Sequence, residues 1–245
     1  SSDIVLALTA DVSTLSNKFV IHGDGNDSTK TDRFELNIEA NQSTNLTGQI
    51  SGDGGILKTG AGVLTLSSAN SYQGDTNIDK GKLIVANTAA LGQATSTLVM
   101  QGGTELELAA NVPFLENNIQ VKGSTVINTL TDTLLNGIVS DAGSISKKGT
   151  GTLTLNRSNS YTGQTLIYEG KIATKENQSL GVNNSVIFKN DGAALQFLST
   201  VTAVANDLVL EKNAVLQVDN QTTLNGSITG AGKLSKQGIG TLTLN

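Results

Sequence analysis

The stretch GQISGDGGILKTGAGVLTL at residues 48–66 recurs twice, and this recurrence decides the fold. The second copy reads GIVSDAGSISKKGTGTLTL at residues 137–155, and the third reads GSITGAGKLSKQGIGTLTL at residues 226–244. Each copy begins 89 residues after the one before it, without insertion or deletion. Self-similarity at a fixed period is typical of solenoids, because each repeat contacts only its neighbours and must keep the same path length.

The period divides the chain into a partial unit at residues 1–47, full units at 48–136 and 137–225, and a partial unit at 226–245. The first 45 positions of the two full units share 20 identities, whereas the remaining 44 positions share 9. The looser half still keeps apolar residues at matching places: Leu106 with Leu195, Leu108 with Phe197, and Val126 with Val215. We interpret residues 1–245 as a single repeat segment and expect it to be an excerpt of a longer array.

The local pattern within each unit predicts short strands. Residues 105–108 alternate Glu and Leu, and residues 152–155 alternate Thr and Leu, which is the period of two expected of a strand. Turns rich in Gly, Asn and Asp follow every few residues. We therefore expect an all-β, right-handed parallel β-helix with about 22 residues per coil, so that four coils fill the period. A set of antiparallel sheets, such as a propeller or a sandwich, is the alternative, but the blades of a propeller repeat at about 40–50 residues and carry aromatic signatures.

The composition excludes several classes of function. The chain has no Cys, so disulfides, thiol catalysis and Cys-based zinc sites are excluded. Its net charge is −5 and its pI is about 4.9, which argues against a nucleic-acid groove or a surface for anionic membranes. Only 15% of the residues are charged and 3% are aromatic, so the surface must be built largely from Thr, Ser, Asn and Gln.

One part of the unit resembles a known family motif. Residues 60–74 read GAGVLTLSSANSYQG, and Thr76, Ile78, Gly81-Lys82-Leu83 and Leu91-Gly92 follow; the second copy, at residues 149–181, has the same skeleton. This sequence resembles the passenger-associated transport repeat of autotransporters. The resemblance implies a right-handed β-helical passenger that is exported through a C-terminal outer-membrane barrel and displayed or released at the bacterial cell surface. The family includes adhesins, surface-layer proteins and supports for protease or toxin modules.

Three functions stay open at this point. Uniform repetition favours a non-catalytic stalk, surface-layer or fibre building block, and the exposed strand edges of a β-helix predict self-association end to end or laterally. The resemblance favours an adhesin that binds a host-cell receptor or a neighbouring cell through outward loops, for which residues 17–35 and 109–118 are the candidates. A polysaccharide-acting β-helical enzyme is the minor alternative, because acidic residues do not cluster along the repeat.

The residues that resemble catalytic or phosphate-binding motifs do not match these motifs when the repeat units are compared. Ser51 precedes Gly-Asp-Gly as in a protease loop, but the equivalent positions in the other copies differ, and the chain has a single histidine, His22. Gly81-Lys82 lacks the following Ser or Thr and the glycine spacing of a phosphate loop. Tyr72 and Tyr161 could stack on carbohydrate, but their identical place in each unit favours structural stacking. We therefore expect no catalytic site.

One segment near the N-terminus has the spacing of a calcium loop. Asp24, Asn26, Ser28, Asp32 and Glu35 fall at positions 1, 3, 5, 9 and 12 of that pattern. Position 6 is Thr29 instead of Gly, and the flanks are predicted to be strands, so an acidic hairpin loop explains the segment more simply. These five residues are the metal-site candidates, and we expect no other cofactor.

Overall fold

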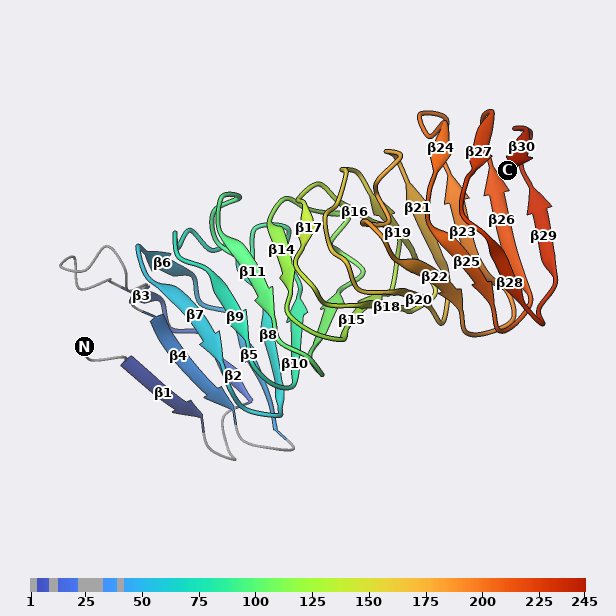
Figure 1. Ribbon diagram of the computed structural model, residues 1–245. Helices are drawn as coiled ribbons and strands as arrows, with labels where there is room; N and C mark the ends of the chain where they lie inside the picture. Colours follow the sequence, from blue (N-terminus) through green and yellow to red (C-terminus); the bar gives the residue numbers. More distant parts are fainter. Residues whose placement is uncertain (1–3, 9–12, 22–32, 39–41) are drawn as a thin grey trace.

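Short parallel strands stacked in register build the part of the chain that the computed structural model describes, which comprises residues 4–8, 13–21, 33–38 and 42–245. Every strand pairing among these residues is parallel. The strands form about ten turns of roughly 20–22 residues each, which confirms the predicted all-β parallel solenoid. Figure 1 shows an elongated body with β1 at one end and β28 to β30 at the other. The described residues include no helix long and apolar enough to cross a membrane.

Each turn contributes strands to sheets that run along the solenoid. The first sheet contains β1 (Ile4–Leu8), β4 (Arg33–Ile38), β7 (Gly55–Lys58), β9 (Thr76–Ile78), β11 (Thr97–Met100), β14 (Asn118–Val121) and β17 (Val139–Ser140). The second contains β2 (Thr14–Leu15), β5 (Ser43–Leu46), β8 (Val63–Leu66), β10 (Lys82–Val85), β12 (Glu105–Leu108), β15 (Thr125–Thr129), β18 (Ile145–Lys148), β20 (Thr165–Ile167), β22 (Ser185–Phe188), β25 (Asp207–Leu210) and β28 (Ile228–Gly230).

The third sheet has seven strands, like the first, and the last two sheets are shorter. The third contains β13 (Phe114–Leu115), β16 (Thr133–Leu135), β19 (Thr152–Leu155), β21 (Lys171–Thr174), β23 (Ala193–Phe197), β26 (Ala214–Val218) and β29 (Leu234–Gln237). The fourth contains β24 (Ala203–Val204), β27 (Thr222–Leu224) and β30 (Leu242–Leu244), and the fifth contains β3 (Phe19–Ile21) and β6 (Ile50–Gly52). In chain order the fourth sheet takes the place of the first in the C-terminal turns, and the fifth takes the place of the third in the N-terminal turns.

The core is a set of side-chain columns parallel to the axis. In the second sheet, Leu64, Leu83 and Leu106 lie directly above one another and are fully buried. Their neighbours on the same strands, such as Thr65 and Glu107, are half-buried on the outer face, as the alternating sequence predicts. Each inward Leu stabilises the fold by about 1.5–3 kcal/mol.

One 89-residue sequence unit does not make a whole number of structural turns, so equivalent residues of successive units lie on different faces of the solenoid. Four turns take 83 residues, since the outer-face column from Thr65 in β8 reaches Lys148 in β18 through four consecutive pairings. The period is six residues longer, so one unit makes about four and one third turns instead of the four expected. Strands that align in the repeat therefore lie on successive faces: β7 in the first sheet corresponds to β18 in the second and to β29 in the third.

Candidate functional site

The repeated asparagine of the motif clamps three turns together inside the solenoid. Asn159 accepts a hydrogen bond from the Val139 N–H at 2.8 Å and donates one to the Ser179 carbonyl at 2.6 Å. In the first unit, Asn70 makes the same two bonds, to Ile50 at 2.8 Å and to Ala90 at 2.7 Å. Both asparagines are buried, so each supplies partners for backbone groups that have no access to water.

The repeated tyrosines are structural, as their identical place in each unit predicted. Tyr72 and Tyr161 are fully buried, and the Tyr161 hydroxyl is hydrogen-bonded to the Thr165 hydroxyl at 2.7 Å. Burial raises the pKa of both phenols far above the usual value, so they stay protonated while the chain is folded. Gly181 has a φ of 77°, and a Cβ there would lie 3.1 Å from the Tyr161 ring and 2.4 Å from its carbonyl oxygen. The ring and the backbone thus require glycine in the Leu-Gly pair of the motif.

The repeated lysine also points inward. Lys147 occupies the core column between Ile127 and Ile167 and is fully buried. Its ammonium donates hydrogen bonds to the carbonyls of Lys148, Gly149 and Glu169, at 2.7, 2.6 and 3.2 Å. These acceptors belong to turns of two consecutive coils, so the buried ammonium joins the coils where they leave the second sheet.

The equivalent lysine of the first unit has the same role one face earlier. Lys58 is fully buried in the first sheet and donates to the carbonyls of Gly60 and Lys80 at 2.5 and 2.8 Å. Burial lowers the pKa of Lys58 and of Lys147 to about 8, so the charged form still predominates at neutral pH. Lys236, in the last turn, is exposed and donates to Gly238 alone among the described residues.

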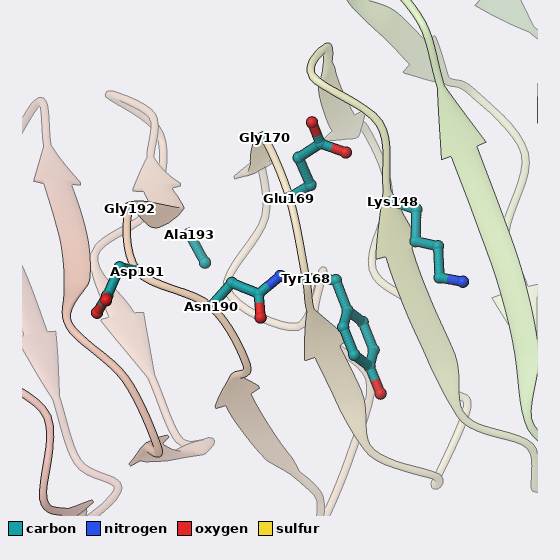
Figure 2. A pocket seen from close by; sticks show the side chains of 8 residues that line it. All are labelled: Lys148, Tyr168, Glu169, Gly170, Asn190, Asp191, Gly192 and Ala193. Carbon is teal, nitrogen blue, oxygen red and sulfur yellow. The ribbon is translucent and has the colours of Figure 1, made fainter.

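The outer surface differs between the units, and it carries a pocket of about 540 Å³. The pocket lies where the chain turns from the second sheet to the third, and Figure 2 shows its side chains. It is lined by Lys148, Tyr168, Glu169, Gly170, Asn190, Asp191, Gly192 and Ala193. The Lys148 ammonium lies 5.9 Å from the centre of the half-buried Tyr168 ring, a cation–π distance.

The candidates for calcium binding fall outside the described residues or lack a described side chain. Asp24, Asn26, Ser28 and Asp32 lie in the undescribed segment 22–32, and Glu35 lies in β4, whose backbone pairing alone is described. Within the described residues no three His, Asp or Glu side chains are placed to hold a metal ion. The calcium site therefore stays a prediction.

The two predicted receptor segments are only partly loops. Residues 109–118 contain the short strand β13, in which Leu115 is buried and Phe114 is 39% exposed. Residues 17–35 include β3 and the start of β4, and residues 22–32 between them are not described. Neither segment includes the Tyr168 pocket. Sequence reasoning missed that pocket because all of its lining residues other than the two glycines differ from their repeat equivalents, and a comparison of outward positions between units would have revealed the substitutions.

Comparisons with known proteins agree with the fold and the motif. The passenger-associated-transport-repeat family matches at residues 56–85 and 145–173, the segments that contain Lys58, Tyr72, Lys147 and Tyr161. The chain is 30% identical over 236 residues to "Adhesin BmaC autotransporter" of Brucella suis biovar 1 (strain 1330). That match covers 85% of this chain and 7% of the relative, so the chain spans a small part of the relative's length. No solved structure matches the chain. The chain thus carries two passenger-associated-transport-repeats, and the two matches together support a segment of an autotransporter passenger domain.

Proposed function

We propose that this segment is a non-catalytic, rod-forming scaffold of an adhesive passenger. As an autotransporter passenger, the chain is exported across the outer membrane to the cell surface. The observation that carries the proposal is the direction of the repeated side chains. Asn159, Tyr161 and Lys147, like their counterparts in the first unit, point inward and bind neighbouring coils, so the repeat serves stacking and length.

Adhesion through outward residues is the second function that we propose. It is supported by the relative named an adhesin and by the outer face, where residues such as Tyr168 differ from their repeat equivalents. The scaffold would then present recognition residues, and the parent chain would carry the outer-membrane barrel and contact a receptor. Self-association end to end or laterally, which the strand edges of a β-helix predict, belongs to the same proposal.

Inserting a second copy of residues 137–225 directly after residue 225 tests the scaffold. Because one unit makes about four and one third turns, the insertion should lengthen the rod by about 21 Å at roughly 4.8 Å per turn. Small-angle X-ray scattering of the purified monomer would measure the longest dimension, and circular dichroism would measure the added β-structure.

The matched control inserts a scrambled 89-residue segment of the same composition, which should not extend the ordered rod. An unchanged longest dimension with the true copy, or a loss of β-sheet signal, would contradict the scaffold function.

A further inference from the structure

The pocket beside Tyr168 has the chemistry of a ligand site on the outside of the rod. Of the three tyrosines, Tyr72 and Tyr161 are fully buried, whereas Tyr168 is half-buried and lines the pocket. Figure 2 shows Lys148 and Asn190 on opposite sides of the Tyr168 ring. An aromatic ring at a surface pocket gives a large apolar contact area with little loss of side-chain entropy on binding.

The polar groups around the ring can serve a ligand. The Glu169 carboxylate and the Asn190 amide are exposed and make no hydrogen bond or ion pair within the described part of the chain. Asp191 differs, because its carboxylate accepts the Asn213 N–H at 2.9 Å and thereby caps the next coil. Carboxylate, amide and ammonium together supply both donors and acceptors along the lining of the pocket.

We propose that this pocket binds a neutral pyranose sugar, with its C–H face on Tyr168 and its hydroxyls on Glu169, Asn190 and Lys148. A pyranose offers an apolar face and a rim of hydroxyls that donate and accept, which matches an aromatic floor with polar walls. Glu169 and Asp191 carry two negative charges against the single positive charge of Lys148, which disfavours an anionic ligand. The proposal rests on the adhesive function and names its ligand class.

The pocket is supported by a rigid frame. The buried Lys147 ammonium donates hydrogen bonds to the carbonyls of Lys148 and Glu169, which line the pocket, and to the carbonyl of Gly149. Gly192, which also lines the pocket, has a φ of 81°, and a Cβ built there would meet no atom within 4 Å. The glycine is therefore required by the backbone conformation, and the space beside it is open. Preorganised walls reduce the entropy lost on binding.

The first unit shows that stacking does not require these outward residues. The positions equivalent to Lys148, Tyr168 and Glu169 are occupied by Thr59, Asp79 and Lys80, although the buried lysine below them is kept. The frame is thus repeated and the pocket surface is specific to the second unit.

Titration of the full 245-residue chain with neutral oligosaccharides tests the proposal. The neutral oligosaccharides tested end in glucose, galactose, mannose or N-acetylglucosamine. Sialylated and sulfated oligosaccharides are tested in parallel as anionic ligands. For this experiment the chain is produced with 3-fluorotyrosine in place of its three tyrosines, so that ¹⁹F NMR gives a separate signal for each. The variant Y168F identifies the signal of Tyr168. We expect at least one neutral oligosaccharide to shift the Tyr168 signal alone, because the other two rings are fully buried.

The double variant Lys148→Thr and Tyr168→Asp, which copies the first unit, should lower the affinity about tenfold or more. Asp79→Ala, at the equivalent place in the first unit, should leave the affinity unchanged. The proposal is overturned if no neutral sugar moves the Tyr168 signal, if only sialylated or sulfated sugars do so, or if the double variant binds equally well. The unit-insertion experiment is independent of sugar, so it distinguishes failure of this site from failure of the scaffold.

Discussion

Tyr161→Ala is expected to lower the free energy of unfolding by about 3–5 kcal/mol, the range for truncating a large buried aromatic side chain. Tyr161 is fully buried, its ring packs against Gly181, and its hydroxyl is bonded to Thr165. The substitution leaves a cavity between coils and an unpaired Thr165 hydroxyl. Because each coil of a solenoid is held by its neighbours, we expect the loss to spread to the adjacent turns. Urea unfolding followed by circular dichroism measures the effect.

Two further variants distinguish the contribution of the buried Tyr161 ring from that of its hydroxyl and from that of a tyrosine at the surface. Tyr161→Phe keeps the ring and should cost about 1 kcal/mol, the usual net value of one hydrogen bond. Tyr168→Ala, at the half-buried surface tyrosine, should cost less than about 1 kcal/mol. Equal losses for Tyr161→Ala and Tyr168→Ala would show that Tyr161 does not stabilise the core as described.

Asn159→Ala should destabilise the chain by about 2–6 kcal/mol, the sum for two buried backbone groups left unpaired at about 1–3 kcal/mol each. The Val139 N–H and the Ser179 carbonyl would lose their partners at 2.8 and 2.6 Å. These groups lie in the turns before and after Asn159, so their amide and carbonyl environments change together. Hydrogen exchange should show faster exchange of the Val139 amide along with the loss of global stability.

Asn156→Ala is the matched control for this side chain. Asn156 is only half-buried, and its amide donates to Asn136 at 2.8 Å on the outer face, where water can replace the bond. Its loss should therefore stay within about 0.5–1.5 kcal/mol. If the two alanine variants lost equal stability, the repeated asparagine would not be a buried clamp.

The sequence predicted the parts of the fold that depend on pattern. Alternation at residues 105–108 placed Leu106 and Leu108 in the core, and the fixed period predicted stacked parallel coils. The equal spacing of Tyr72 and Tyr161 correctly favoured a structural role over carbohydrate stacking. Val126, paired with Val215 as an apolar position, lies on the outer face instead, because a valine suits either side of a strand.

Three features could not be derived from the sequence. The third of a turn by which each unit overshoots depends on strand register, and turn length varies from 19 to 23 residues along the column that starts at Leu64. A charged lysine is expected at the surface, whereas Lys147 points into the core. Only the lysine at the same place in every copy indicated a structural role. The Tyr168 pocket brings together residues from β18, β23 and two turns, and six of the eight differ from their repeat equivalents.

The displacement of equivalent residues by one face is tested most directly by distances between spin labels on two pairs of outward-facing positions. One pair joins Thr65 to Lys148, which the register stacks four turns apart on the same face. The other joins Thr65 to Thr154, its repeat equivalent, which lies in β19 of the third sheet. Double electron–electron resonance should give about 19 Å between the backbones of the first pair, at roughly 4.8 Å per turn, and a clearly longer distance for the second. A shorter distance for Thr65 and Thr154 would contradict the displacement and return the unit to a whole number of turns.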